Sequence, residues 1–209
     1  MVITHHGGQC FKVTFGDLTL VFDPIAKGGT LPSVRFGADV ALVSRDHADM
    51  NGIDEVTYGD KKPFAVTGPG EYEKQGITIQ GFLSGSKYGL KKDQESAVNT
   101  IYSVVLEDMT LVHLGALIDE ELSKEARENL GEIDVLFVPI GGDGVLSSAK
   151  AHELAVSLEP KIIIPMHFDE KTLQSFLKAS GNGSDTVDKL TLKKKDLIGR
   201  DGSIIVVTP

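Results

Sequence analysis

The sequence predicts a single mixed α/β domain in which helices cover the outer faces of β-sheets. Two observations predict this fold class. In the first half, apolar and polar residues alternate with period two between turn residues, which is typical of antiparallel hairpins. In the second half, short apolar runs alternate with helix-forming segments, which is typical of strands with helices packed against them. A chain of 209 residues is long enough to bury one core, so we expect one domain spanning residues 1–209.

Strands dominate the first half. Residues 10–15 alternate between apolar and polar side chains, Gly16 and Asp17 supply a turn, and residues 18–22 return as the second arm of a hairpin. A short apolar strand over residues 39–43 runs directly into the polar cluster 44–49. Further strands are expected at residues 64–66, 77–82, 100–106 and 110–113.

The second half combines helices with buried strands. We expect helices over residues 120–130, from Ser147 or Ser148 through residue 154, and over residues 171–178. The expected strands are residues 135–139, 161–165, 189–192 and 203–207. The stretch 180–185, which contains glycine and serine, is expected to be flexible.

The composition argues against several classes of protein. A net charge of −9 makes nucleic acid an unexpected partner, because phosphate binding needs a basic face. No apolar run approaches the ~20 residues of a membrane span, and the first residues lack the basic and apolar regions of a signal peptide. The single cysteine, Cys10, excludes an intrachain disulfide and lies in an alternating strand, where we expect a small core residue. We therefore expect a cytoplasmic protein without membrane or nucleic-acid partners.

Three histidines lie just past the ends of predicted strands. His47 follows the strand 39–43, His113 closes the strand 110–113, and His167 follows the strand 161–165. Polar side chains at the ends of buried strands tend to gather at one rim of a sheet. Asp46 and Asp49 accompany the first histidine, and imidazole with carboxylate is the ligand set of a zinc or iron site. Taken singly, each histidine is better explained as an ordinary hydrogen-bonded residue at a strand end.

The order of the motifs resembles one known family. The segment 44–50 is similar to the metal-binding motif Thr-His-x-His-x-Asp-His of the metallo-β-lactamase superfamily, in its branch of small L-ascorbate-6-phosphate-lactonase-like hydrolases. Further segments resemble that branch in family order: residues 3–13, 22–24, 68–72, 113–116 and 165–168. The resemblance covers nearly the whole chain. It implies a four-layer αββα sandwich, the metallo-β-lactamase fold.

The chain departs from the family motif at several ligand positions. Arg45, Met50 and Ala116 stand where the resemblance implies histidine, histidine and aspartate, and Gly8 stands where many members of the branch carry histidine. A guanidinium group has only donors and cannot ligate a metal, and a thioether suits Cu(I) better than Zn²⁺. The remaining family ligands are His47, Asp49, His113 and His167. The resemblance therefore implies an incomplete metal site that holds at most one ion.

Three interpretations of this pocket remain open. In the first, one Zn, Fe or Mn ion sits among the four remaining ligands, with Asp49 near the attacking water, and the protein hydrolyses a small ester, lactone or phosphoester. In the second, Arg45 replaces the metal's charge, pairs with Asp46 or Asp49, and leaves a metal-free pocket for an anionic ligand. In the third, the pocket is inert and the domain is a structural or interaction module.

Two further segments lie near this predicted pocket. Asp23, which precedes Pro24, is either a residue that orients a ligand histidine or a turn residue that accepts backbone hydrogen bonds. Gly141–Gly144 lacks the lysine of a phosphate-binding loop, so we expect a tight strand-to-helix turn beside the pocket. A homo-oligomer is expected only by analogy with the family.

Overall fold

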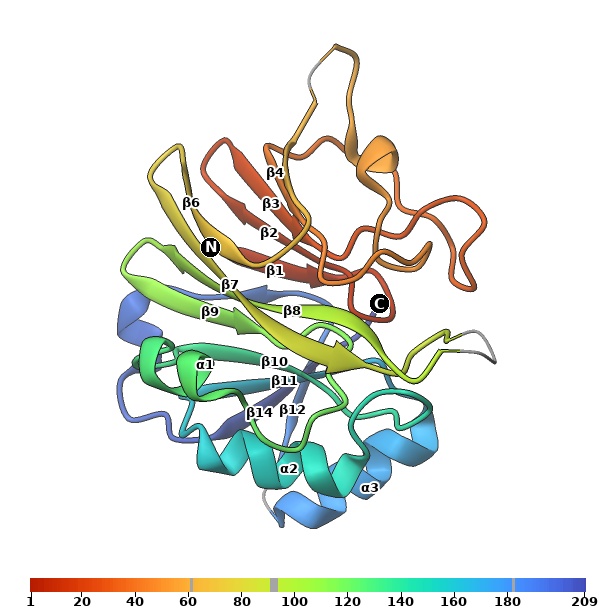
Figure 1. Cartoon of the computed structure of the whole chain (residues 1–209). Helices are drawn as coiled ribbons and strands as arrows, with labels where there is room; N and C mark the ends of the chain where they lie inside the picture. Colours follow the sequence, from red (N-terminus) through yellow and green to blue (C-terminus); the bar gives the residue numbers. More distant parts are fainter. Residues whose placement is uncertain (61, 91–93, 182) are drawn as a thin grey trace.

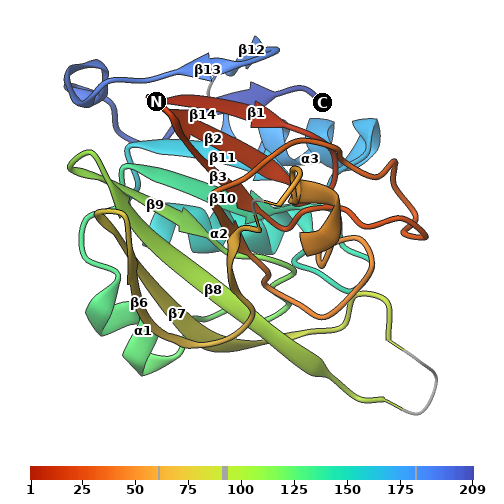
Figure 2. The same ribbon diagram turned by 90° about the horizontal axis from the view of Figure 1, so that it is seen from above.

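The fold consists of two β-sheets packed face to face, with helices against one of them (Figures 1 and 2). It is seen in a computed structural model that describes residues 1–60, 62–90, 94–181 and 183–209. The six-stranded sheet has the order β13-β1-β2-β3-β4-β5, and the eight-stranded sheet has the order β12-β14-β11-β10-β9-β8-β7-β6. The predicted class, a mixed α/β fold with covered sheets, is confirmed.

The six-stranded sheet contains the predicted hairpin. Strands β2 (Phe11–Phe15) and β3 (Leu18–Phe22) pair antiparallel about the turn at residues 16–17, and β1 (Val2–His5) pairs antiparallel with β2. Strand β3 then continues in parallel pairing to β4 and β5. The remaining bounds are β4 (Val40–Leu42), β5 (Phe64–Val66) and β13 (Leu190–Thr191).

The eight-stranded sheet joins an antiparallel half to a parallel half. Its antiparallel strands are β6 (Gly70–Lys74), β7 (Ile77–Ser86), β8 (Ala97–Leu106) and β9 (Met109–His113). Its parallel half continues from β9 through β10 (Val135–Pro139), β11 (Ile162–Met166), β14 (Ser203–Val207) and β12 (Asp185–Val187). Strand β6 falls where the sequence predicted only a turn and a loop, and β12 begins at the end of the stretch that was expected to be flexible.

Three helices pack on the eight-stranded sheet or beside it: α1 (Lys124–Asn129), α2 (Ser148–Ser157) and α3 (Glu170–Ser180). Helix α2 begins after Ser147, whose hydroxyl accepts a hydrogen bond from the backbone of Lys150, as predicted. Helix α1 is shorter than the predicted span 120–130, because Ser123 caps its N-terminus by accepting the Ala126 N–H. Two 3-10 turns, η1 (Ile53–Val56) and η2 (Lys194–Leu197), complete the described elements.

The layers differ in how their outer faces are covered. One apolar cluster fills the space between the sheets, and a second lies between the eight-stranded sheet and the helices. The outer face of the six-stranded sheet packs instead against irregular segments and η1, through residues such as Ile25, Val34 and Val56. Irregular chain therefore occupies most of the outer layer that the family resemblance predicted as helical.

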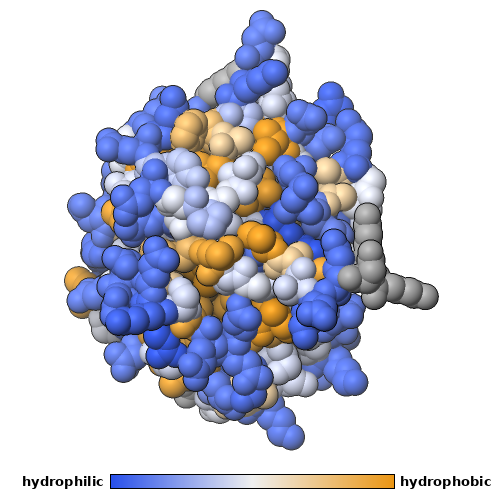
Figure 3. Space-filling model, viewed as in Figure 1, coloured by the Kyte–Doolittle hydropathy of each residue, from blue (hydrophilic) through white to orange (hydrophobic). Residues whose placement is uncertain are grey.

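The face of the molecule seen in Figure 3 is mostly hydrophilic. In the view of Figure 3, apolar residues show mainly in the middle of the molecule and are surrounded by hydrophilic side chains. Among the described residues, no helix is long and apolar enough to cross a membrane.

Candidate functional site

The candidate residues gather where parallel strands of both sheets end. Asp23 follows β3, the segment 44–49 follows β4, His113 ends β9, and His167 follows β11. Contacts join the two sheets at this rim. His113 Nδ1 lies 3.9 Å from Asp23 Oδ2, and the backbone N–H of His167 donates to the carbonyl of Gly8 at 2.9 Å. The rim contains two groups of polar residues: an inner pair, Asp23 and His113, and an outer group, His47, Asp49 and His167.

Asp23 fastens the loop that carries the outer group. Its fully buried carboxylate accepts the Ser44 N–H and the Ser44 hydroxyl, each at 2.7 Å. Burial raises the pKa of Asp23 to about 7, although the two hydrogen bonds from Ser44 oppose that rise. Of its two predicted roles, Asp23 therefore takes the one of accepting a backbone hydrogen bond. Its nearest histidine nitrogen, on His113, is too far away for a hydrogen bond.

His113 has a partner for each ring nitrogen inside the protein. Nε2 lies 2.9 Å from the carbonyl of Gln9, and the N–H of Gly115 donates to Nδ1 at 3.2 Å. One neutral tautomer, with its hydrogen on Nε2, satisfies both bonds. Burial lowers the pKa of His113 to about 3, and its ring stacks on Phe22 with centroids 4.7 Å apart. In this conformation neither nitrogen is available to a metal.

Asp49 is the most heavily hydrogen-bonded residue of the outer group. Its Oδ2 accepts the hydroxyls of Thr30 and Tyr88, both at 2.7 Å, and its Oδ1 accepts the Thr30 N–H at 2.5 Å. Burial works to raise the pKa of Asp49, but the hydrogen bonds from Tyr88, Thr30 and Leu31 hold it below its usual value. The carboxylate is therefore an anion whose charge is stabilised by neighbouring loops.

The phenol of Tyr88 stands among the outer group. Its ring meets His47 edge-on with centroids 5.1 Å apart and His167 edge-on at 4.8 Å, while its hydroxyl bonds to Asp49. His47 Nδ1 also accepts the Asp49 N–H at 3.2 Å and lies 3.6 Å from Asp49 Oδ2. The side chains of the outer group therefore surround one aromatic ring.

Backbone contacts fix the position of Tyr88. The Lys87 N–H donates to the carbonyl of Gly144 at 3.0 Å, and the Tyr88 N–H donates to the Ser86 hydroxyl at 3.1 Å. A Cβ atom at Gly144 would lie 2.6 Å from the backbone nitrogen of Tyr88, and the φ of Gly144 is +90°. Only glycine permits this approach. The segment Gly141–Gly144 is the predicted turn between β10 and α2, and Gly141 and Asp143 line a cavity beside Tyr88.

Apolar packing surrounds the same phenol. Met50, Ala116 and Val145 are buried and form a small cluster, against which Tyr88 packs. Met50 and Ala116 are two of the positions where the family resemblance implies a metal ligand. At these positions the chain makes apolar contacts.

The predicted ligand set does not converge on one point. Among the described residues, no group of three or more His, Cys, Asp or Glu side chains is arranged to hold a metal ion. His113 is occupied by Gln9 and Gly115, as described above. The outer group has suitable donor types, two imidazoles and a carboxylate, but Tyr88 fills the space between them. The outer group therefore fits a metal only after the Tyr88 side chain turns away.

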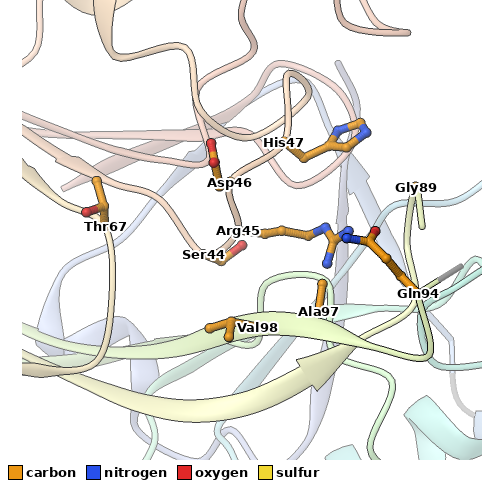
Figure 4. A pocket seen from close by; sticks show the side chains of 9 residues that line it. All are labelled: Ser44, Arg45, Asp46, His47, Thr67, Gly89, Gln94, Ala97 and Val98. Carbon is orange, nitrogen blue, oxygen red and sulfur yellow. The ribbon is translucent and has the colours of Figure 1, made fainter. Parts of the chain in front are cut away.

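Arg45 lies against the same loop without the predicted ion pair. Only 7% of its surface is exposed, and its Nε and Nη1 have no hydrogen-bond partner among the described residues. Asp46 points away from it and accepts the Asn51 amide at 2.9 Å (Figure 4), while Asp49 is taken by Thr30 and Tyr88. No ion pair joins Arg45 to Asp46 or Asp49 among the described residues, so the pairing predicted for a metal-free pocket is not seen in this conformation.

Two cavities flank the Tyr88 segment. The first has a volume of about 460 Å³ and is lined in part by Arg45, His47 and Gly89 (Figure 4). The second has a volume of about 330 Å³ and is lined in part by His167 and Tyr88. The outer group is therefore flanked on two sides, and Arg45 lines the first of these cavities.

Sequence reasoning missed Tyr88 and Thr30, which hold Asp49. Both belong to segments without a recognisable motif: Thr30 follows Gly28 and Gly29, and Tyr88 follows the end of β7. Asn99 was also missed. Its amide donates to the carbonyl of Leu114 and accepts the Ala116 N–H, so it fixes the loop after β9. No local signal identifies such residues, because their partners lie far away in the sequence.

Comparison with known proteins agrees with this architecture. Residues 2–167 match the family described as the beta-lactamase superfamily domain. A UPF0173 protein of Pyrococcus abyssi is 32% identical over 188 residues, which are 80% of this chain and 83% of that protein. A UPF0173 protein of Enterococcus faecalis, named a metal-dependent hydrolase, is 25% identical over 198 residues, which are 81% of this chain and 87% of that protein.

Solved structures show the same fold. A crystal structure from Thermotoga maritima, described as a candidate Zn-dependent hydrolase of the metallo-beta-lactamase superfamily, is 28% identical, with a TM-score of 0.76 and coverage of 99% of both chains. A metallo-beta-lactamase fold protein from Bacillus subtilis is 11% identical, with a TM-score of 0.62 and coverage of 99% of this chain and 96% of that chain. The family match spans well over half of the sequence, and this chain belongs to the beta-lactamase superfamily.

Proposed function

We propose that this protein is a hydrolase of a small ester, lactone or phosphoester that uses one divalent metal ion. The observation that carries the proposal is the arrangement of His47, Asp49 and His167 around the side chain of Tyr88. The metal-dependent hydrolases named among the relatives support it. Zinc is our first choice of metal, with iron and manganese as alternatives, because imidazole with carboxylate suits all three.

The outer group would hold the metal. Two imidazoles and one carboxylate leave a coordination position for water or substrate, which is typical of catalytic sites rather than structural ones. When bound, the metal would supply Lewis-acid polarisation of the scissile carbonyl or phosphoryl group. Asp49 is already anionic, because its hydrogen bonds hold its pKa low, and this charge favours a cation beside it. His113, which we first expected among the ligands, is not part of this proposal.

Other residues would keep this group in place. Asp23 ties Ser44 to the end of β3, so the loop carrying His47 and Asp49 starts from a fixed point. Tyr88 would have to release Asp49 Oδ2 and withdraw its ring from between the imidazoles. We therefore treat Tyr88 as a residue that competes with the metal for Asp49.

A metal-free binding module is the second candidate. One observation favours it: two guanidinium nitrogens of Arg45 have no hydrogen-bond partner among the described residues, and Arg45 lines the same cavity as His47. In that case Arg45 alone would supply positive charge, and the protein would bind an anionic ligand without hydrolysing it.

Metal analysis of tag-free protein separates the two candidates. We expect about one equivalent of zinc, iron or manganese by inductively coupled plasma mass spectrometry, and loss of it in His167→Ala and Asp49→Asn. Tyr88→Phe should retain the metal, because it removes only the hydroxyl that competes for Asp49. His152→Ala is the matched control, because His152 lies on α2 away from the rim. Hydrolysis of p-nitrophenyl acetate and p-nitrophenyl phosphate should follow metal content across the variants.

The opposite result is equally clear. If the wild type and Tyr88→Phe both remain without metal after incubation with each ion, the metal-dependent proposal fails. Equal metal content in wild type and His167→Ala would place the ion elsewhere and also contradict it.

A further inference from the structure

We propose that Arg45 forms an anion-binding site, in which the cavity beside it receives a carboxylate or phosphate group of the substrate. The anion site stands on the surroundings of Arg45 itself. The hydrolysable remainder of the ligand rests on the proposed function. The substrate class is then a small ester or lactone that carries a separate negative charge.

The guanidinium group of Arg45 is buried without enough hydrogen-bond partners in the part of the chain that the structure describes. Arg45 is 93% buried, because only 7% of its surface is exposed, and Nε and Nη1 have no hydrogen-bond partner among the described residues. A buried donor without a partner loses its hydration and gains nothing in return, and the loss is larger for a charged group. Arginine remains protonated in proteins, so the cost falls on a cation. An arriving oxyanion would remove it.

Neither nearby aspartate, Asp46 or Asp49, serves as a counter-ion for Arg45. The nearby carboxylates are committed elsewhere: Asp46 accepts the Asn51 amide, and Asp49 accepts the hydroxyls of Thr30 and Tyr88. Among the described residues, no ion pair joins Arg45 to either aspartate. Nε and Nη1 of Arg45 therefore remain without a hydrogen-bond partner among the described residues, where a purely structural arginine would be paired.

Arg45 lines a cavity that is large enough for a small ligand. The cavity has a volume of about 460 Å³, which is within the range of small-molecule pockets. Figure 4 shows the guanidinium reaching from the loop after β4 toward Gln94, with Ala97 and Val98 on the adjacent strand β8. A cation with polar and apolar neighbours suits a ligand that has an anionic head and a short carbon body.

The cavity at Arg45 extends to His47, a member of the outer group. Arg45 and His47 line the same cavity and belong to the same loop. A ligand whose anionic group pairs with the Arg45 fork would therefore lay its body along His47. Guanidinium matches carboxylate and phosphate in a bidentate geometry, so this contact would fix orientation as well as position.

The overall charge makes such a site specific. A net charge of −9 repels anions from the protein as a whole. Binding of a small anion would therefore report a local site rather than general attraction. Anion binding would also survive at physiological ionic strength, because a buried pair is screened much less than an exposed one.

Calorimetric titration tests the inference with inorganic phosphate and acetate as probes, at constant ionic strength and after treatment with EDTA. We expect saturable binding to the wild type, and binding roughly 10- to 100-fold weaker in Arg45→Gln, because a charge-assisted hydrogen bond is lost. Arg45→Lys, which keeps the charge but loses the fork, should fall between them. Arg127→Gln removes an exposed arginine on α1 and should bind like the wild type. The stronger probe identifies the preferred head group.

Two outcomes overturn the inference: no saturable binding of either probe to the wild type, or equal affinity in Arg45→Gln and Arg127→Gln. The test is distinguishable from that of the proposed function. Probe binding that depends on Arg45 in a protein without metal would retain the anion site and reject the hydrolase. Metal bound by the outer group, with probe affinity unchanged in Arg45→Gln, would retain the hydrolase and reject the anion site.

Discussion

The inner pair and the outer group lie on the same rim but depend on different parts of the chain. Asp23 and His113 are fully buried and bond to neighbours at the strand ends and on the first loop, Ser44, Gln9 and Gly115. The outer carboxylate, Asp49, is also buried, but it bonds to the exposed Thr30 and the half-buried Tyr88. The inner pair therefore belongs to the framework, while water or a ligand can replace the partners of the outer group.

The largest expected effect is on stability. Asp23→Ala leaves the Ser44 N–H and hydroxyl without partners in a dry interior, and we expect it to lower the free energy of unfolding by about 3 to 5 kcal/mol. Asp49→Ala should cost only about 1 to 2 kcal/mol, because water reaches its former partners. Urea denaturation measures both.

Glu121→Ala is the control for these two variants, since Glu121 is exposed before α1 and should stay within about 0.5 kcal/mol of the wild type. Equal losses in Asp23→Ala and Asp49→Ala would erase the distinction between the inner pair and the outer group.

The pH dependence of stability sharpens the comparison. The pKa of Asp23 is about 7 in the folded protein, above its unfolded value of 3.8, so the folded state binds more protons between these values. The contribution of Asp23 to the free energy of unfolding is therefore fully present at low pH and is lost as pH rises toward 7. The Asp23→Asn variant lacks this pH-dependent contribution, because an amide does not titrate. Its stability relative to the wild type should rise with pH between 4 and 7, by up to about 1.4 kcal/mol per pH unit.

Urea denaturation at several pH values gives this difference directly. The pH dependence of stability that His113 causes has the opposite sign. Its pKa falls to about 3 in the folded protein, so its contribution to stability is lost as pH drops below its unfolded pKa of 6.5. A stability difference between Asp23→Asn and the wild type that does not change with pH would show that the Asp23 carboxyl titrates normally.

The smallest expected effect concerns the outer group. Tyr88→Phe removes one hydrogen bond to Asp49 and should cost about 1 kcal/mol. It should also raise the pKa of Asp49, because that hydrogen bond favours the carboxylate form. Carboxyl-carbon NMR titration measures the shift. Tyr72→Phe, which removes an exposed hydroxyl bonded to the carbonyl of Pro69, is the matched control and should leave Asp49 unchanged.

Sequence patterns predicted the framework better than the site. Period-two alternation located the β2–β3 hairpin, and apolar runs located β10 and β11, because these strands have at least one buried face. Strand ends predicted that His47 and His167 lie in one region, and both rings contact Tyr88 in the structure. The partners of His113 could not be predicted, since Gln9 lies 104 residues away. The same holds for Tyr88 and Asp49, which are 39 residues apart.

Strand β6 escaped prediction for a physical reason that has its own consequence. It forms one end of the eight-stranded sheet, and its residues are mostly exposed, so no buried face imposes an apolar pattern. Its sequence includes Glu71, Glu73 and Lys74. Charged side chains on an outermost strand discourage another chain from adding to the sheet. The polarity that hides β6 from pattern recognition therefore protects the protein from aggregating through this edge.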